Sequence, residues 1–159
     1  MQTQKIVTFL WFDNQAEEAA NHYASIFPDS KIVNVMRYGD AGPGPKGTVM
    51  CVTFQLAGQE FMALNGGPQF KFTEAISLFV KCETQAEVDR LWEQLSAGGA
   101  QGPCGWLKDR YGLSWQVVPN ALAEMLGDKD PEKANRAMQA MLEMGKIDIA
   151  ALRQAFEGR

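Results

Sequence analysis

Histidine is almost missing from this chain, and several other markers of function are missing with it. There is one histidine, the three cysteines lie far apart without a CxxC pair, and no stretch of about 18 apolar residues occurs. One imidazole cannot build a histidine-rich metal site, and an odd number of scattered cysteines favours reduced thiols over a disulfide framework. The short apolar runs fit neither a signal peptide nor a membrane span. We therefore expect a cytoplasmic protein with no membrane partner.

Basic residues are also too few for a nucleic-acid surface. Fifteen Lys and Arg against 19 Asp and Glu give a formal charge of -4, the isoelectric point is near 5.0, and the basic residues are scattered, whereas phosphate contacts need a concentrated basic face. The 159 residues suffice for one domain or two small fused halves. We expect a small-molecule ligand, or another protein, and no nucleic acid.

What the chain does contain is an internal repeat. IVTFLWFDNQAE at residues 6–17 returns as ISLFVKCETQAE at residues 76–87, an offset of 70 residues. Each copy is typical of a strand followed by a helix, because an apolar run gives way to a capping residue, Asn14 or Thr84, with glutamate three positions later. The repeat predicts two copies of one strand-and-helix unit.

Apolar periodicity and turn residues predict the remaining elements. Residues 1–68 are expected to form a βαβββ module, with strands at 5–12, 31–38, 49–56 and 60–64 and a helix at 15–27. Residues 69–119 are expected to form a second, shortened module, which ends in a hairpin around the turn at 108–112. Residues 120–159 are expected to form a helical tail, with Asp130 and Asp148 as helix caps. The predicted fold class is α+β in one integrated domain.

The last hairpin carries the pattern D-x-[YF]-G-x-x-W-[QE], here Asp109, Tyr111, Gly112, Trp115 and Gln116. A repeated βαβββ module with this hairpin resembles the vicinal oxygen chelate superfamily of glyoxalases, bleomycin-resistance proteins and extradiol dioxygenases. FLWFDNQAEEAANHYASIFPDS, FMALNGGPQFKFTEAISLFV and CGWLKDRYGLSWQVVP resemble its PhnB-like branch, often labelled a 3-demethylubiquinone-9 3-methyltransferase domain. The resemblance implies curled mixed sheets that enclose a cup, commonly in a homodimer.

The resemblance also implies where a metal would bind. In metal-using members, His, Gln or Glu ligands come from the first and last strands of each module and hold a divalent ion. Here residues 6–8, 61–64 and 76–78 offer none of these ligands, and only Gln116 stands where the family often has glutamate. His22, on the first helix, is interpreted as a surface or packing residue. We therefore expect no metal and no cofactor.

Other catalytic chemistry finds little support in the residues. A Rossmann-type methyl-donor site needs glycine between a strand and a helix, and neither FDNQAE nor CETQAE contains one. Cys104 lies near Lys108 and Arg110, which favour a thiolate, but no second histidine could act as its base. We predict no catalytic residue.

The alternation of a strand suggests a ligand pocket. Gln116 and Trp115 must point to opposite sides, so that if Gln116 faces the cup, Trp115 packs under the helices. The predicted pocket residues are Thr8, Leu10, Phe12, Asn65, Trp106, Ser114 and Gln116. An apolar cup with a few hydrogen-bonding groups is typical of a site for a neutral or aromatic small molecule.

Two hypotheses remain from the sequence. The first is a metal-free homodimer that binds a small molecule by sequestration. The second is an enzyme, either a glyoxalase-like lyase or isomerase that binds metal through groups such as Glu60, Glu74 and Gln116, or a methyltransferase as the family label states.

Overall fold

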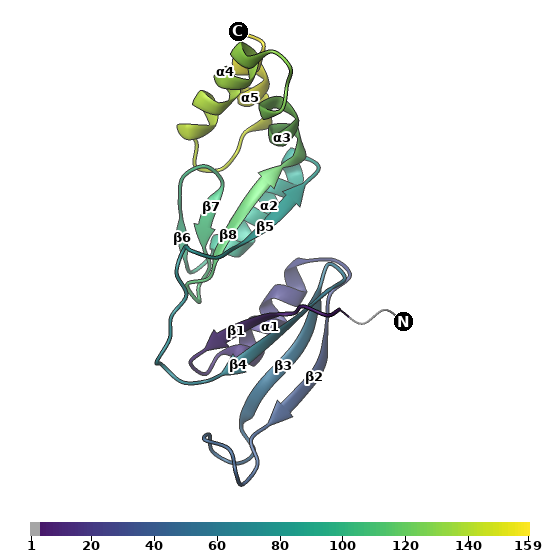
Figure 1. Ribbon diagram of the computed structural model, residues 1–159, viewed down its shortest axis with the longest axis vertical. Helices are drawn as coiled ribbons and strands as arrows, with labels where there is room; N and C mark the ends of the chain where they lie inside the picture. The colour runs from purple at the N-terminus through teal and green to yellow at the C-terminus, as the bar shows by residue number, and fades with distance from the viewer. Residues whose placement is uncertain (1–3) are drawn as a thin grey trace. The chain divides into compact units, whose positions relative to one another are not determined.

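The computed structural model describes residues 4–159. Its internal contacts divide the chain between Phe72 and Thr73 into two compact units. Figure 1 shows the order of the elements. Each unit contains a four-stranded sheet and a helix that follows its first strand, and the second unit also contains three C-terminal helices. We describe each unit by itself.

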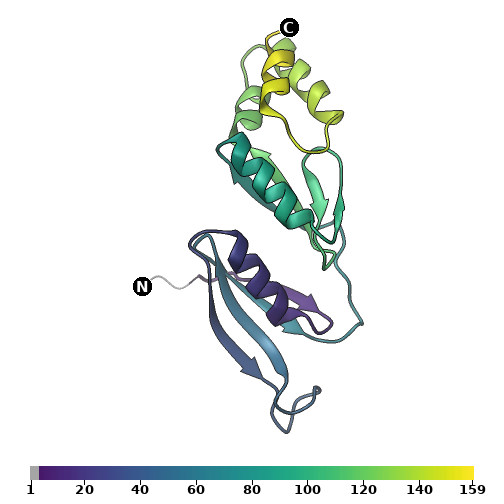
Figure 2. The same ribbon diagram turned by 180° about the vertical axis from the view of Figure 1, so that it is seen from behind.

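The first unit is a mixed sheet covered on one side by a helix. In chain order it contains β1 (Thr8–Phe12), α1 (Ala16–Ile26), β2 (Lys31–Arg37), β3 (Val49–Leu56) and β4 (Gln59–Asn65). The strands lie in the order β1-β4-β3-β2, with β1 parallel to β4 and the other pairs antiparallel. Figure 2 shows α1 lying across one face of this sheet.

Aromatic contacts identify the sheet face that packs on α1. The Tyr23 ring on α1 lies 6.4 Å from the Phe54 ring on β3, and Phe54 lies 5.6 Å from Phe61 on β4, all centroid to centroid. Phe61 is the partner of Thr8 in the register of β1 and β4. Because side chains alternate along a strand, the side of β1 that carries Thr8 also faces α1.

The second unit repeats this arrangement, as the sequence repeat predicts. It contains β5 (Ser77–Cys82), α2 (Gln85–Ser96), β6 (Ala100–Gln101), β7 (Trp106–Lys108) and β8 (Ser114–Pro119). The strand order is β5-β8-β7-β6, with β5 parallel to β8. The α+β fold of two mixed sheets is confirmed, and the shortened strand is β6, which has only two residues.

The two helices of the repeat begin differently, and one predicted cap is wrong. On α2 the Thr84 hydroxyl accepts a hydrogen bond from the Glu87 N–H at 3.2 Å, as predicted. On α1 the residue before the helix is Gln15, with no side-chain cap, so Asn14 does not cap it. The Ala16 N–H instead donates to the Asn65 side-chain oxygen at 2.8 Å. The end of β4 therefore supplies the cap that the local sequence was expected to supply.

The hairpin pattern of the second unit is explained by Asp109, which is only 2% exposed. One carboxylate oxygen accepts hydrogen bonds from the N–H groups of Tyr111 and Leu113 at 2.9 and 3.1 Å. The other accepts from the indole N–H of Trp115 at 2.9 Å. Gly112 between them has φ +88, which suits glycine best. The carboxylate thus joins the turn to the following strand.

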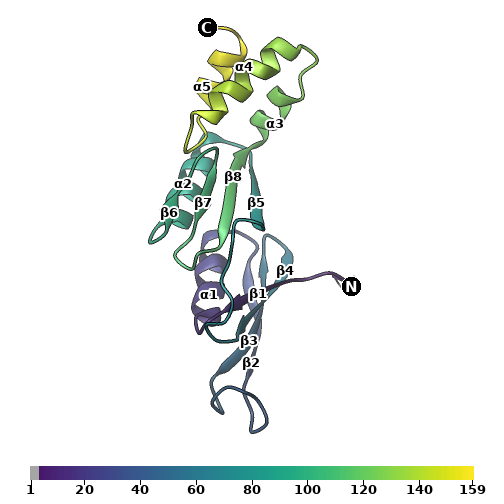
Figure 3. The ribbon, with the colours of Figure 1, turned by 60° about the vertical axis from the view of Figure 1, so that its left-hand side comes forward.

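The C-terminal tail consists of α3 (Asn120–Leu126), α4 (Pro131–Leu142) and α5 (Ile149–Phe156), which Figure 3 shows following β8. Asp130 and Asp148 cap α4 and α5, as predicted. One cluster of buried side chains packs these helices against each other and against β8. Its members are Val118, Leu122, Met125, Ala137, Ile147 and Leu152. No helix within residues 4–159 is long and apolar enough to cross a bilayer.

Candidate functional site

One side of the second sheet is covered by α2 and the other is not, and we call the uncovered side the open face. Trp115 and Val117 on β8 are buried together with the apolar stripe of α2, so the residues that alternate with them point to the open face. Strand pairing joins Ser114 to Ser77 and Lys108, and Gln116 to Phe79 and Trp106. The open face includes Ser77, Phe79, Trp106, Lys108, Ser114 and Gln116. Val118, further along β8 on the same side, packs with the C-terminal helices.

A hollow of ≈ 540 Å³ borders the open face on the side of β6 and β7. Its lining is mainly apolar and comes from the strands and from the segment before β7; it includes Glu74, Gly102, Pro103, Trp106, Lys108 and Ser114. The volume lies within the roughly 300–1,000 Å³ that is usual for small-molecule sites. The indole of Trp106 offers the largest flat apolar surface in this lining.

The hydroxyl of Ser114 has no hydrogen-bond partner among residues 4–159, although the residue is only 1% exposed. A buried hydroxyl without a partner costs free energy, and native proteins retain few of them. This hydroxyl belongs to a residue that lines the hollow. Among the open-face residues named above, it is the buried side-chain polar atom that has no partner within residues 4–159.

Three other polar side chains of the open face are paired. The Gln116 amide donates to the Ser77 hydroxyl at 3.0 Å. Lys108 forms an ion pair with Glu74, and both side chains are about half exposed. The hydrogen bond from Lys108 holds the pKa of Glu74 below its ordinary value. The hollow therefore combines an apolar wall, a spare hydroxyl and an exchangeable ion pair.

The donor set of this face does not fit a catalytic divalent metal. The first strand of this sheet, β5, carries Ser77, and the last, β8, carries Gln116. Each side chain could offer a metal only a neutral oxygen ligand, and the two are hydrogen-bonded to each other. In residues 4–159 no group of three His, Cys, Asp or Glu side chains could hold an ion. Zinc, iron and manganese sites need imidazole, thiolate or carboxylate ligands, so the residues of the open face do not support a reaction step through a metal.

The predicted pocket residues divide into two groups, and the orientation of one group is corrected. Trp106, Ser114 and Gln116 share the open face. In the first unit, Leu10 and Phe12 are 5% and 3% exposed and face α1 together with Thr8, so they do not line an open surface. The uncovered side of β1 carries Phe9 and Trp11 instead.

Asn65, the remaining predicted residue, has a structural role. Its side chain caps α1 and donates to the Val49 carbonyl at 3.1 Å, while its own carbonyl accepts from the Tyr38 hydroxyl at 2.6 Å. It also lines a second hollow, of ≈ 920 Å³, under the loop at residues 39–48. Gly42 and Gly44 are needed there, because a Cβ on either would meet the Tyr38 ring within 2.6 Å. The Tyr38 hydroxyl and the Asn65 amide, both in the lining of this hollow, already have hydrogen-bond partners within the protein.

The three cysteines are not disposed for shared chemistry. Cys51 and Cys82 are buried, and burial raises the pKa of both thiols, that of Cys82 to about 12. Cys104 is partly exposed and stands in the segment before β7, with a left-handed φ of 57. Thiolate chemistry at neutral pH is therefore disfavoured at Cys51 and Cys82.

Two βαβββ units, each with a mixed sheet and one covering helix, define a protein of the glyoxalase/bleomycin resistance/dioxygenase fold. The chain belongs to the family described as 3-demethylubiquinone-9 3-methyltransferase, whose model matches residues 4–118. This agrees with the resemblance to the PhnB-like branch that the sequence patterns indicate.

Solved structures agree with this assignment. The PhnB protein from Bacillus cereus is 45% identical, with a TM-score of 0.66, and the match covers 73% of this chain and 99% of that one. Protein PA1353 from Pseudomonas aeruginosa is 22% identical over 74% of this chain and 98% of its own, with a TM-score of 0.61. The fosfomycin resistance protein FosX from Listeria monocytogenes is 15% identical over 75% and 94%, with a TM-score of 0.50. The last two show the fold alone. No protein with a curated description matches the chain.

Proposed function

We propose that this protein binds a small organic molecule at the hollow beside the open face of the second sheet, without a metal. The observation that carries the proposal is the buried, unpartnered hydroxyl of Ser114 in the lining of that hollow. A ligand oxygen or nitrogen would give this hydroxyl the partner that it lacks, and so would offset its cost in the free protein. The function is then one of binding or sequestration.

The chemistry of the lining narrows the ligand class. The Trp106 indole and the mainly apolar wall favour a flat aromatic body. The Ser114 hydroxyl can donate to an acceptor atom, and Lys108 is held by an exposed ion pair with Glu74, which solvent screens strongly. A ligand carboxylate could replace Glu74 at the Lys108 ammonium. An aromatic acid or a related anion is therefore favoured over a neutral aromatic molecule.

Thermal shift measurements with matched ligands test this proposal. Naphthoate and naphthamide share one aromatic body and differ in charge, so that naphthoate is expected to raise the melting temperature more. At 100 times the dissociation constant a ligand adds about 2.7 kcal/mol, which corresponds to roughly 5–10 °C for a chain of this size. The shift should persist after treatment with a metal chelator.

Variants of the lining locate the site. Ser114→Ala should reduce the ligand-induced shift about as much as a tenfold loss of affinity would, and should leave the free protein as stable or more stable, because it removes an unpaired buried hydroxyl. Trp106→Ala should abolish the shift. Trp11→Ala is the control, since Trp11 lies on the first unit, with its indole N–H already donating to the Gly67 carbonyl. Equal shifts in all three variants would contradict the proposal.

An enzymatic function is the second candidate, and the description of the matching family favours methyl transfer. S-Adenosylmethionine in the same thermal shift assay tests it, and divalent ions test a glyoxalase-like lyase or isomerase. Stabilisation by either one, without any by aromatic acids, would favour the enzyme. A cytoplasmic homodimer remains part of our proposal, and sedimentation of the purified protein tests the dimer.

A further inference from the structure

The C-terminal tail lies outside the family match, which ends at residue 118. It nevertheless makes specific contacts with the segment at 102–105, immediately before β7. That segment supplies Gly102 and Pro103 to the wall of the hollow and leads directly into Trp106. The tail therefore contacts the backbone on which one wall of the proposed ligand site is built.

Backbone hydrogen bonds join the tail to this wall. The Cys104 N–H donates to the Met144 carbonyl at 2.7 Å, and the Gly105 N–H donates to the Gly145 carbonyl at 2.8 Å. Cys104 has a φ of 57, which costs free energy for a residue with a Cβ and persists only where surrounding contacts hold it. The two bonds from the tail are contacts of this kind.

Side-chain packing makes the same connection. Ile147 is fully buried in the tail cluster. A Cβ on Gly105, which has φ +84, would meet the Val117 carbonyl oxygen at 2.9 Å and the Ile147 side chain at 3.3 Å. The wall segment thus comes close to the tail because residue 105 is glycine.

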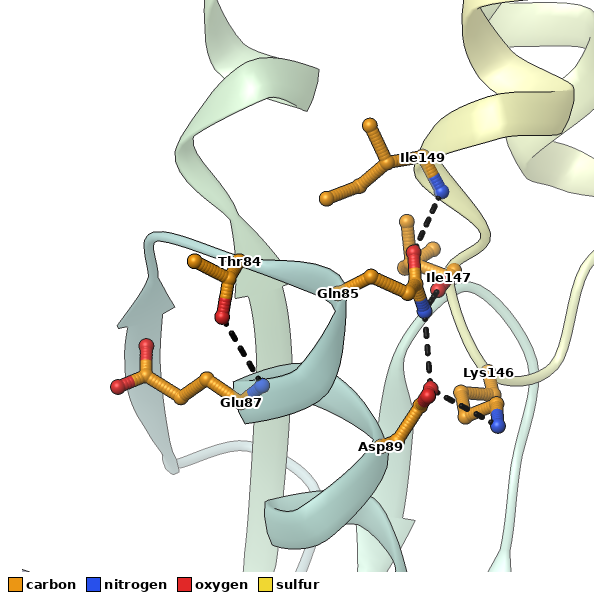
Figure 4. Close-up of polar contacts among 7 residues, drawn as sticks. All are labelled: Thr84, Gln85, Glu87, Asp89, Lys146, Ile147 and Ile149. Atoms are coloured by element: carbon orange, nitrogen blue, oxygen red, sulfur yellow. Dashed lines mark hydrogen bonds and ion pairs between the residues drawn. The ribbon is translucent and has the colours of Figure 1, made fainter.

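Gln85, at the start of α2, holds the tail segment in place (Figure 4). Its side-chain oxygen accepts from the Ile149 N–H at 2.8 Å, and its amide nitrogen lies 2.9 Å both from the Ile147 carbonyl and from an Asp89 carboxylate oxygen. Lys146 forms an ion pair with Asp89 at 3.0 Å. A single amide therefore binds the chain on both sides of Asp148.

We propose that the tail is a brace that fixes the 102–105 wall of the hollow, and that Gln85 is the positioning residue on which the brace depends. The importance of this wall for a ligand rests on the function proposed above. The brace itself does not, because its bonds join protein atoms to one another and involve no ligand. The side-chain hydrogen bonds of Gln85 go to Asp89, Ile147 and Ile149, so we expect it to act on the wall through the segment at 144–149.

Gln85→Ala tests the brace, and the repeat provides a matched control. Gln15 holds the corresponding place at the start of α1, where it is exposed, and no helix follows β4 within residues 66–72. We expect Gln85→Ala to accelerate amide hydrogen exchange at Cys104 and Gly105 about tenfold, while Gln15→Ala leaves these rates unchanged. The N–H groups of β3 in the first unit serve as the internal reference.

Alkylation of Cys104 by iodoacetamide provides a second readout in the same variants. Cys51 and Cys82 are buried with raised pKa values, so early labelling reports Cys104. The alkylation rate should change severalfold in Gln85→Ala and remain unchanged in Gln15→Ala. Equal rates in both variants would overturn the proposal, and so would faster exchange that includes β3, since that indicates a general loss of stability. Neither readout involves a ligand, so failure of the proposed binding function would be seen separately.

Discussion

Replacing Asp109 should separate the contributions of its two carboxylate oxygens. Asp109→Ala leaves three N–H donors without their acceptor, those of Tyr111, Leu113 and the buried Trp115 indole. Hydrogen bonds to a charged group are worth about 1.5–3 kcal/mol each, but the turn can open to water, so we expect a total loss of about 3–5 kcal/mol. That is a large part of the 5–15 kcal/mol typical of a domain.

Asp109→Asn should lose less, because its side-chain oxygen can still accept from the two turn N–H groups. Only the Trp115 indole then faces a donor where it had an acceptor, which predicts a loss of about 1–2 kcal/mol. Asp40→Ala is the control, since Asp40 is exposed and forms an exposed ion pair with Lys46. Urea unfolding at neutral pH, followed by tryptophan fluorescence, gives the three free energies. Equal losses in Asp109→Ala and Asp40→Ala would refute this account of the hairpin pattern.

Four further predictions concern single residues, each checked by urea unfolding. Asn65→Ala should cost about 1–2 kcal/mol and Thr84→Ala about 1 kcal/mol, because each removes a helix cap. Ala57→Asn should stabilise the protein by about 0.5–1 kcal/mol, because Ala57 and Gly58 form a two-residue turn with positive φ, where Asn-Gly is preferred. Burial raises the folded-state pKa of Cys82 to about 12, so the folded state keeps this proton above about pH 8.5 while the unfolded chain loses it. Stability should therefore fall as pH rises from about 9 to 11, less steeply in Cys82→Ala.

The sequence predicted the architecture because the repeat encodes it twice. Thr84 and its glutamate three positions later form a local cap, and local patterns can be recognised without coordinates. Asn14 has the same pattern, but Asn65 reaches the helix from the end of β4. Because this capping residue lies 49 residues away in sequence, no pattern next to the helix could predict it.

The face assignment of β1 failed for a similar reason. Alternation tells which residues share a side of a strand, but not which side the helix covers. The repeat itself contained a signal: Phe9 matches Phe79, and Phe79 is the strand partner of Gln116. Phe9 and Trp11, rather than Leu10 and Phe12, therefore correspond to the open face.

The candidate site was partly predictable. Trp106, Ser114 and Gln116 follow from the hairpin pattern and the alternation of β8. The unpartnered state of the Ser114 hydroxyl depends on every neighbouring atom, so no pattern in the chain could show it. The bonds of Gln85 join positions 62 and 64 residues apart, and only the fold brings these together.

Two-dimensional NMR of the chelator-treated protein, titrated with naphthoate, tests metal-free binding at this hollow most directly. We predict saturable shifts of the Trp106 indole and of the Ser114 and Lys108 amides, with little change in the first unit. Shifts concentrated in the hollow around Tyr38, or no shifts until a divalent ion is added, would contradict the account.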